Sequence, residues 1–476
     1  MKKGEILENI EVEKLVFGGK GFARHSDGKV IFITGGAIPG SMVNLRIIKK
    51  RKDFYETQIT EIIKKSPIET GKYAIFPGAP WINIDYQEQL KIKDNQIKEA
   101  FFHILKLSPE IPGTKGLNFL PIVGAENIFG YRNKIEFSFG KYISHREKRE
   151  EHFNAGFHKQ GEFSKILDYD SCDLIDDESN AIYKEIKDFA KTSGLPVYDQ
   201  KTQEGFWRHL IIRKTYFTEQ IMIILSFYDN FFEDKKERED IIQKIKNFFA
   251  ELQKKYLHIS SIYLSYNNNK ADIAIDRLEL INGKEVITEK LLNLEFDIGP
   301  KSFFQTNSLG AEKLYSLVRD FAKKELYQNG ITLDLYAGTG TIGMIFADIS
   351  KEVYSVEMVE EASKNGEENA KKNEIQNMIF INKKVEDFLD AYINDGKKAD
   401  ILIIDPPRAG MHPSTLPHLL TFNTKQILYV SCNPATLVRD LEYILKNSSY
   451  KIEKIQAVDM FPHTHHIETI VSLLQV

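Results

Sequence analysis

The chain has 476 residues, 42% hydrophobic and 28% charged, a balance typical of a globular protein with about three domains. Its two cysteines exclude a disulfide framework and any four-cysteine metal or cluster site, and no apolar run approaches the roughly 18 residues of a membrane span. The 64 Lys and Arg against 68 Asp and Glu give a net charge of −4, which does not by itself indicate a nucleic-acid binder.

Residues 1–65 are predicted to form a small closed β-barrel. Alternating polar and apolar segments are separated by glycine turns, such as residues 18–21, at the spacing typical of such barrels. This part carries 13 Lys and Arg against 8 Asp and Glu, or +5, so the remaining residues carry −9. A basic module can hold a polyanion locally, because charge is screened over about 10 Å. The basic run at residues 49–52 is either a solvated turn or a phosphate contact.

Residues 66–295 are predicted to form a central α+β domain without an obvious chemical motif. A long helix over residues 86–107 keeps helical spacing of its apolar residues, and we expect it to pack on the C-terminal domain. The other predicted elements are strands 134–140, 209–213, 220–228 and 261–266 and helices 179–192 and 238–256.

Residues 296–476 are predicted to form an α/β, doubly wound, Rossmann-like domain, because apolar strands alternate there with amphipathic helices. Ligands of such a sheet bind at the carboxyl ends of its strands. The predicted strands are residues 331–336, 352–357, 378–381, 401–405, 427–431, 452–459 and 467–474.

A glycine-rich turn closes the first of these strands. The sequence Asp334-Leu-Tyr336-Ala-Gly338-Thr-Gly340 leads into a helix, and the next strand ends at Glu357. Glycine lets the backbone turn tightly and approach a ligand, and an acid at this place can accept both hydroxyls of a ribose. The pattern predicts a nucleoside cofactor, but it serves NAD and S-adenosylmethionine alike.

Two further strand ends carry reactive groups. Asp405 precedes two prolines that fix a rigid bend, and its carboxylate can accept a hydrogen bond from a planar substrate. Cys432 follows another strand, just before a helix start. A lone cysteine is usually a small buried apolar residue. At a helix start, however, the dipole is expected to lower the pKa of the thiol, which makes Cys432 a candidate nucleophile.

The loop before the last strand contains His463, His465 and His466 between Asp459 and Glu468. Three histidines suggest a metal, but no other Cys or His lies at ligand spacing. We therefore expect no metal site, and expect the loop to bring Glu468 to the crevice.

Residues 302–307, Ser-Phe-Phe-Gln-Thr-Asn, precede a predicted helix over residues 309–322. Asn307 is predicted to cap this helix, because Asn is a preferred N-cap residue. Gln305 has no apolar face to pack on, so its amide could meet the amino-acid end of a cofactor.

Together these motifs resemble the RNA uracil-5 methyltransferase family, whose members use S-adenosylmethionine. Five elements match in family order: residues 303–307, the glycine loop, Asp-Pro-Pro-Arg at 405–408, Ser-Cys-Asn-Pro at 431–434 and residues 459–468. The first 65 residues resemble the TRAM domain, an OB-like RNA-binding β-barrel. Residues 131–134 and 208–213 resemble the central domain of the family, which implies that residues 66–295 bind RNA.

The resemblance implies a role for each matched residue. Cys432 would be the nucleophile, Glu468 the general base, and Asp405 would position the substrate. The cofactor contacts would come from Gln305, Tyr336, Gly338, Gly340, Glu357 and Asp405.

In one respect the sequence departs from the family. Many ribosomal-RNA members hold a [4Fe–4S] cluster with four cysteines, three of them just before the helix that starts at Tyr86. Here this stretch is Phe76-Pro-Gly-Ala79, and only Cys172 remains. One thiolate cannot hold a cluster, so we expect no iron–sulfur cluster. In its place we expect packing around Phe76 and Trp81, with Cys172 an inert buried thiol.

We therefore expect a cytoplasmic, monomeric enzyme that forms 5-methyluridine in RNA and does not contact a membrane; the N-terminus has no secretory signal. The favoured partner is 23S rRNA, and the alternative is the T-loop uridine of tRNA. An NAD-dependent oxidoreductase would explain the glycine loop but not Cys432, Asp405 and Glu468. A catalytically inactive RNA-binding protein would leave Cys432 and Glu468 without a role.

Overall fold

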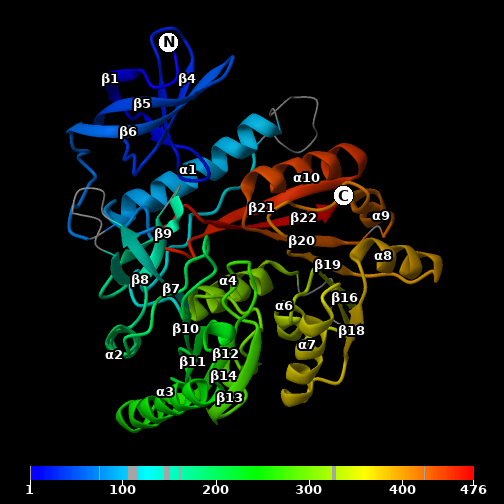
Figure 1. Cartoon of the computed structure of the whole chain (residues 1–476). Coiled ribbons are helices and arrows are strands. Elements are labelled where there is room, and N and C mark those ends of the chain that lie inside the picture. Colours follow the sequence, from blue (N-terminus) through cyan, green and yellow to red (C-terminus); the bar gives the residue numbers. More distant parts are fainter. Residues whose placement is uncertain are drawn as a thin grey trace.

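The computed structural model of the chain describes residues 2–73, 75–105, 116–143, 151–159, 162–323, 329–422 and 424–476. Strands in these ranges form three large sheets and a two-stranded hairpin, which agrees with the multi-sheet α/β architecture expected from the sequence. The N-terminal sheet lies at one end of the molecule, beside helix α1 (Tyr86–Ile104), as Figure 1 shows. Every helix in the described part of the chain is too short or too polar to cross a membrane.

The N-terminal sheet has six strands in the order β1-β5-β6-β4-β3-β2. Alternate residues of β4 and β5 are buried, so that Ile31, Ile33, Val43 and Leu45 fill the interior. The edge strands β1 and β2 form no ladder with each other in the described residues, so closure into a barrel stays a prediction. The strands are β1 (Ile6–Glu11), β2 (Lys14–Leu15), β3 (Gly21–Arg24), β4 (Val30–Thr34), β5 (Met42–Lys50) and β6 (Phe54–Lys64).

Helix α1 connects the N-terminal sheet to the rest of the molecule. Asp85 caps its first turn by accepting backbone hydrogen bonds. Ile97 and Phe101 are buried in the core of the C-terminal sheet, where α1 packs against α10 (Pro434–Asn447). Residues 106–107, the end of the predicted helix, lie outside the described residues.

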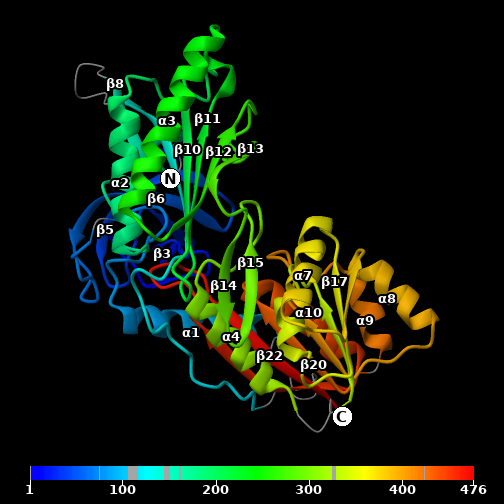
Figure 2. The same ribbon diagram turned by 90° about the horizontal axis from the view of Figure 1, so that it is seen from below.

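The central sheet has the strand order β13-β12-β11-β10-β7-β8-β9 and is antiparallel except between β11 and β12. Helices α2 and α3 lie side by side on one face (Figure 2), over Phe137 and Leu210. The opposite face carries Ser138 and His209, which are register partners on β7 and β10. The elements are β7 (Lys134–Ile143), β8 (Glu151–Lys159), β9 (Glu162–Asp168), α2 (Asp177–Thr192), β10 (Trp207–Lys214), β11 (Ile221–Phe227), η1 (Asp229–Phe231), α3 (Lys235–Lys255), β12 (Ile259–Tyr266) and β13 (Arg277–Gly283).

A hairpin of β14 (Ile287–Leu291) and β15 (Leu294–Ile298) leads to α4 (Ser308–Phe321). Asn307 caps α4, as predicted, because its side-chain oxygen accepts the N–H of Gly310 at 2.9 Å. Its amide nitrogen donates to the Met460 carbonyl at 2.7 Å, so the cap also ties α4 to the loop before the last strand.

The C-terminal sheet has the order β18-β17-β16-β19-β20-β22-β21, with five parallel strands and an antiparallel pair at one edge. Leu333 and Leu402 pack towards α8, α9 and α10, whereas Ile401 and Ile403 pack towards α4 and α6 on the other face. The strand order reverses between β16 and β19, which places a ligand crevice at their carboxyl ends. The elements are β16 (Ile331–Leu335), α6 (Thr341–Phe346), β17 (Glu352–Glu357), α7 (Glu360–Lys372), β18 (Met378–Asn382), α8 (Val385–Asn394), β19 (Ile401–Ile404), α9 (Thr415–Thr421), β20 (Gln426–Ser431), β21 (Tyr450–Val458) and β22 (Glu468–Gln475).

Candidate active site

A cavity of about 470 Å³ opens at the carboxyl ends of β16, β19 and β20. It lies at the reversal of strand order, where the sequence pattern predicts ligands of a doubly wound sheet. Residues from all five sequence motifs meet in its wall. The predicted site residues that line it are Gln305, Tyr336, Gly338, Asp405, Cys432 and Glu468.

The glycine loop is held in backbone conformations that few residues adopt. Gly338 and Gly340 have φ of +57° and +70°, and Tyr336 has φ of +61°. A left-handed tyrosine costs on the order of 1–3 kcal/mol, and such strain clusters at functional sites. A Cβ on Gly340 would lie 2.8 Å from the side chains of Met378 and Phe380, so glycine is also required by space. Gly340 starts α6 and supports the loop without lining the cavity.

Asp334, at the end of β16, offers a buried acceptor to a ligand. One carboxylate oxygen accepts the N–H of Gly343 at 2.9 Å, whereas the other, Oδ1, is buried and has no hydrogen-bond partner among the described residues. Burial raises the pKa of this carboxyl to about 7. Because an unpaired buried acceptor is costly, and Asp334 lines the cavity, the site suits a ligand with a donor such as an ammonium group. The sequence marked Asp334 only as the start of the motif.

Glu357 lines a different, adjoining cavity of about 480 Å³, which shares Tyr336 and Pro407 with the first. Its two carboxylate oxygens accept the N–H groups of Gly338, at 2.9 Å, and Val359, at 2.8 Å. The carboxylate therefore supports the glycine loop and keeps further lone pairs for a ligand. The predicted cofactor contacts thus divide between two neighbouring cavities that meet at Tyr336.

Cys432 lies between β20 and α10, half-buried in the first cavity. Asn433 caps α10, and its amide donates to the Arg408 carbonyl at 2.9 Å, which ties the Cys432 loop to the Asp405 loop. Burial, and next the charges of Glu468 and Asp405, raise the pKa of the thiol to about 11. The expectation that the helix start lowers the pKa of the Cys432 thiol is therefore wrong for this structure. A helix terminus contributes only about 0.3–1 kcal/mol at an exposed position, less than burial and two neighbouring carboxyl groups contribute in the opposite direction.

Glu468 and Asp405 are the two carboxyl groups of the cavity. Glu468 is 7% exposed at the start of β22, and no group in the described residues donates a hydrogen bond to its carboxylate. Burial, and next the charge of Asp405, raise the pKa of Glu468 well above its ordinary value, while burial raises the pKa of Asp405 to about 7. Close to neutral pH such a pair holds a proton and can also release it. The nearby Arg408 favours the charged form of Glu468.

The histidines before Glu468 are packed into the protein. His463 stacks on Phe129 with ring centroids 4.6 Å apart, and burial lowers its pKa to about 4. Its Nδ1 lies 3.0 Å from Gln89 Nε2, and its backbone N–H donates to Gln89 Oε1 at 2.8 Å. The described residues contain no group of three or more His, Cys, Asp or Glu side chains arranged to hold a metal ion.

Sequence reasoning missed the residues of α1 that hold this loop. Lys93 Nζ and Asp459 Oδ1 form an ion pair of 2.7 Å in which both side chains are fully buried. Gln89, Lys93 and Gln96 recur at helical spacing and are all buried. Polar residues recurring at helical spacing beside the apolar stripe of this amphipathic helix were the available signal.

The segment that would carry cluster cysteines is filled by aromatic packing. Phe76 stacks on Phe157 with ring centroids 5.4 Å apart, and Cys172 is buried in the same core. Burial raises the pKa of the Cys172 thiol to about 11. Trp81 lies in a separate core, with residues of the N-terminal sheet. The absence of an iron–sulfur cluster stays a prediction from the cysteine content.

Comparison with known proteins gives a consistent result. The sequence model of the family described as tRNA (uracil-5-)-methyltransferase matches residues 130–476. A relative from Clostridium tetani, named as an uncharacterized RNA methyltransferase, is 36% identical over 99% of this chain and 98% of its own. A relative of the same description from Caldanaerobacter subterraneus is 35% identical over 100% of both chains. The solved structure of Pyrococcus abyssi tRNA (uracil-54, C5)-methyltransferase with S-adenosyl-L-homocysteine has a TM-score of 0.74 and 27% identity, over 98% of this chain and 100% of that one.

Proposed function

Because the chain belongs to the tRNA (uracil-5-)-methyltransferase family, we propose that it methylates C5 of a uridine in RNA through a covalent bond between Cys432 Sγ and C6 of the uracil ring. One observation carries this proposal: Cys432, Glu468 and Gly338 line a common cavity although they come from distant parts of the sequence. A nucleophile, a base and a turn for a nucleoside cofactor are the three parts that this reaction needs.

The residues of the two adjoining cavities fit S-adenosylmethionine. The unpaired oxygen of Asp334 suits the ligand's ammonium group, and the Gln305 amide suits its carboxylate. Glu357, which keeps free lone pairs, suits the ribose hydroxyls. The family match favours this ligand over NAD, which the glycine loop alone leaves open.

The protein residues supply the chemistry that uracil C5 lacks. As the Cys432 thiol releases its proton to solvent, Sγ bonds to C6, and the electrons of the C5–C6 double bond move towards O4 to give an enolate with carbanion character at C5. When bound, S-adenosylmethionine supplies the electrophilic methyl group that C5 takes up. The Glu468 carboxylate then removes the C5 proton, the C5–C6 double bond forms again, and Sγ leaves. Its raised pKa makes Glu468 a stronger base, and Asp405 holds the uracil edge.

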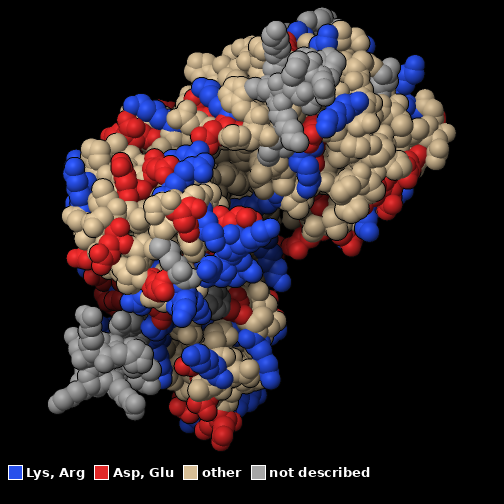
Figure 3. All heavy atoms as spheres, turned by 90° about the horizontal axis from the view of Figure 1, so that it is seen from above, with Lys and Arg blue, Asp and Glu red and all other residues tan. Residues whose placement is uncertain are grey.

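The uridine must leave any base pair before Cys432 can reach C6. Phe303, 68% exposed at the cavity, offers an aromatic face to a splayed base. Arg408 is exposed at the same cavity and forms no ion pair among the described residues. Figure 3 shows Lys and Arg side chains gathered around a hollow near the middle of one face of the molecule. These cationic side chains suit the phosphate backbone of RNA.

For the substrate we propose 23S rRNA, supported by the resemblance of residues 1–65 to the TRAM domain. The T-loop uridine of tRNA is the second candidate, because the Pyrococcus abyssi protein, similar over nearly the whole chain, acts on uracil-54 of tRNA. Nucleoside mass spectrometry with position mapping, on rRNA and tRNA from a strain lacking the gene, separates the two. The fraction that loses 5-methyluridine identifies the substrate.

The test of the mechanism is Cys432→Ala. Methylation of RNA should fall to background, because no other thiol lines the described cavity, while S-adenosylmethionine binding measured by calorimetry should persist. Wild-type protein should also form a stable adduct with 5-fluorouracil-containing RNA, and the variant should not. Full activity of the variant would refute the covalent mechanism, and an absent wild-type adduct would favour an inactive RNA-binding protein.

A further inference from the structure

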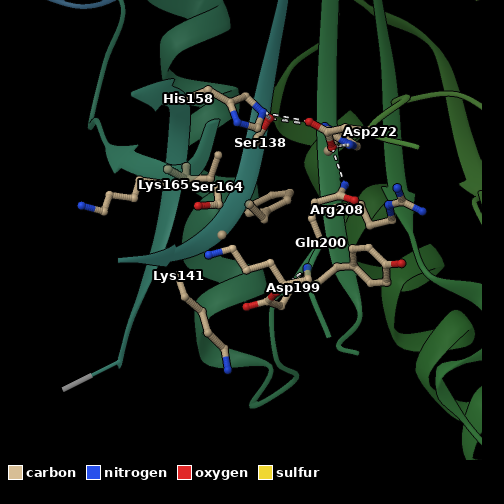
Figure 4. Close-up of a pocket in the computed structure, with 15 residues that line it drawn as sticks. Ser138, Lys141, His158, Ser164, Lys165, Asp199, Gln200, Arg208 and Asp272 are labelled. Carbon is tan, nitrogen blue, oxygen red and sulfur yellow. Dashed lines mark hydrogen bonds and ion pairs between the residues drawn. The ribbon is translucent and has the colours of Figure 1, made fainter. Parts of the chain in front are cut away.

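A separate cavity of about 270 Å³ lies on the central sheet, on the face opposite to α2 and α3. Ser138, His158 and His209 reach it from β7, β8 and β10, and Gln200 and Asp272 complete its floor from loops. His158 and Asp272 point towards each other across this floor (Figure 4). None of these side chains takes part in the proposed reaction.

Hydrogen bonds and ion pairs organise the floor around one carboxylate. Asp272 Oδ2 lies 3.1 Å from His158 Nε2, and Asp272 Oδ1 lies 3.2 Å from His209 Nε2. Gln200 Nε2 donates to Oδ1 at 2.6 Å. Burial raises the pKa of Asp272, but hydrogen bonds from both histidines outweigh this and lower it. The single carboxylate of the floor is therefore engaged by its neighbours and opposes an incoming anion only weakly.

The wall of this cavity is positively charged. The second carboxylate, Asp199, is also engaged, because it accepts the backbone N–H of Lys201 at 2.7 Å and of Thr202 at 3.2 Å. Lys201 itself is exposed, and its ammonium has no partner among the described residues. Counting the histidines as neutral, the lining has two more positive than negative charges, although Lys165 is paired with Glu162 just outside it. The cationic lining residues are Lys141, Lys165, Lys201 and Arg208.

This cavity and the active site lie on the same face of the central sheet. His209 and Arg213 are four residues apart on β10, about 13 Å along the strand. The Arg213 guanidinium donates to the carbonyls of Gly299, at 3.1 Å, and Ser302, at 2.9 Å, directly before Phe303 of the active-site cavity. Ile211, midway between them, is buried, so an RNA strand that contacts both cavities has to pass around this part of the sheet.

We propose that this cavity binds the phosphate group of a nucleotide, and that the RNA strand entering the active site provides it. Its volume admits a phosphate with part of its sugar and no larger nucleic-acid element. A free nucleotide carries the same phosphate chemistry, so the experiment measures both sources. That the strand is the RNA substrate rests on the proposed function. The existence of an anion site does not.

Three variants of the full-length protein test this site. Lys201→Glu reverses its exposed charge, and Ser164→Trp places bulk at an exposed residue of the lining without changing charge. Lys244→Glu, exposed on α3 against the other face of the sheet, is the matched control for charge reversal. Binding of a labelled 12-nucleotide uridine-containing RNA is measured by anisotropy at several salt concentrations, and binding of 5′-UMP by competition. Thermal unfolding and S-adenosylmethionine binding check that each variant is folded.

We expect the Lys201 and Ser164 variants to bind RNA roughly fivefold more weakly. For the Lys201 variant, the slope of log Kd against log salt concentration should also be smaller by about 0.7 than for the Lys244 control. Loss of 5′-UMP binding with unchanged RNA binding would overturn the strand as the source. RNA and 5′-UMP affinities equal to those of the control would overturn the site. A wild-type protein that binds RNA in this way but transfers no methyl group would refute the proposed function and leave the phosphate site standing.

Discussion

At the scale of single residues, the surroundings of Cys432 oppose its ionisation in the free protein. A pKa of about 11 leaves roughly one thiolate in ten thousand at pH 7. Burial is the largest cause, followed by the charges of Glu468 and Asp405, while Arg408 acts in the opposite direction. The proposed nucleophile is therefore protected from adventitious alkylation and oxidation until a substrate changes its surroundings.

This protection predicts a particular pH dependence for alkylation of Cys432. The rate with iodoacetamide should rise about tenfold per pH unit from pH 7 to pH 9.5, because the thiolate fraction rises in this way below a pKa of about 11. Asp405→Asn should shift the profile to lower pH, since it removes a like charge. Peptide mapping by mass spectrometry separates Cys432 from the buried Cys172, which serves as the internal reference. A plateau below pH 8.5 would show that the helix start does activate the thiol.

Glu468→Gln should separate bond formation from bond breakage. The substituted amide cannot take the C5 proton, so methylated RNA should stay bound to Cys432, and turnover should fall by about 10²-fold or more. Denaturing gels would show the protein–RNA adduct accumulating with S-adenosylmethionine present. Asp405→Asn is the matched comparison, because loss of substrate positioning should reduce adduct formation instead. Rapid turnover of the Glu468 variant without adduct would assign the base to another group.

The sequence predicted six of the residues that line the active-site cavity, but not that Gly340 and Glu357 lie outside it, and not the chemical state of the lining groups. Cys432 and Asp405 end neighbouring parallel strands, and the carboxyl ends of such strands share one edge of a sheet. The pKa of Cys432 depends on Glu468 and on burial, which are set by tertiary packing. For the same reason the sequence did not reveal the unpaired oxygen of Asp334 or the separate cavity of Glu357.

At the scale of elements, helix α1 holds the loop that leads to Glu468. Lys93 Nζ pairs with Asp459 and also donates to the Phe461 carbonyl at 3.2 Å. Gln89 holds both the backbone and the side chain of His463, whose φ of +65° is unusual for a residue other than glycine. The helix could be predicted from apolar spacing, but its partner lies about 370 residues away in the sequence, so no local pattern identified it.

Lys93→Met should therefore destabilise the protein and slow the reaction. Removing one partner of a buried ion pair leaves Asp459 charged and without its counter-ion, at a cost of about 3–5 kcal/mol. Lys98→Met, on the same helix, is the control, because its surface pair with Asp94 is worth less than about 0.5 kcal/mol. Urea unfolding followed by fluorescence, with kcat measured below the transition, compares the two variants. Equal unfolding midpoints would contradict a supporting role for the buried pair.

At the scale of the whole molecule, one turn of the N-terminal sheet reaches the loop before Glu468. Leu15 and Ile38 pack on Trp81, next to α1. A Cβ on Gly19 would lie 3.3 Å from His465 Nδ1, so the turn at residues 17–20 lies against the loop before Glu468. Alternation and glycine spacing predicted β structure here and located β4, β5 and β6, whereas β3 was not predicted. The docking of this sheet could not be predicted in the same way, because it depends on a few apolar residues whose partners lie in other segments.

Because the sheet docks in this way, some of its basic residues lie close to the proposed active site and others lie far from it. Lys20 is exposed in the turn beside His465 and forms no ion pair among the described residues. The run at residues 49–52 lies at the end of β5, about 26 Å along the strand from Met42, which is close to the docked edge. Of the two interpretations of this run, the solvated turn therefore fits the arrangement better.

Lys20→Glu should then weaken RNA binding and reduce its salt dependence, whereas Lys52→Glu should change neither beyond the small effect of net charge. A lost phosphate contact to a single strand reduces the slope of log Kd against log salt by about 0.7. The two variants carry the same charge change on exposed residues of one sheet, so general electrostatics affects both equally. Anisotropy titrations between about 50 and 200 mM salt provide the comparison. If Lys52→Glu has the larger effect, RNA crosses the far end of the sheet, and the turn beside His465 serves only to dock it.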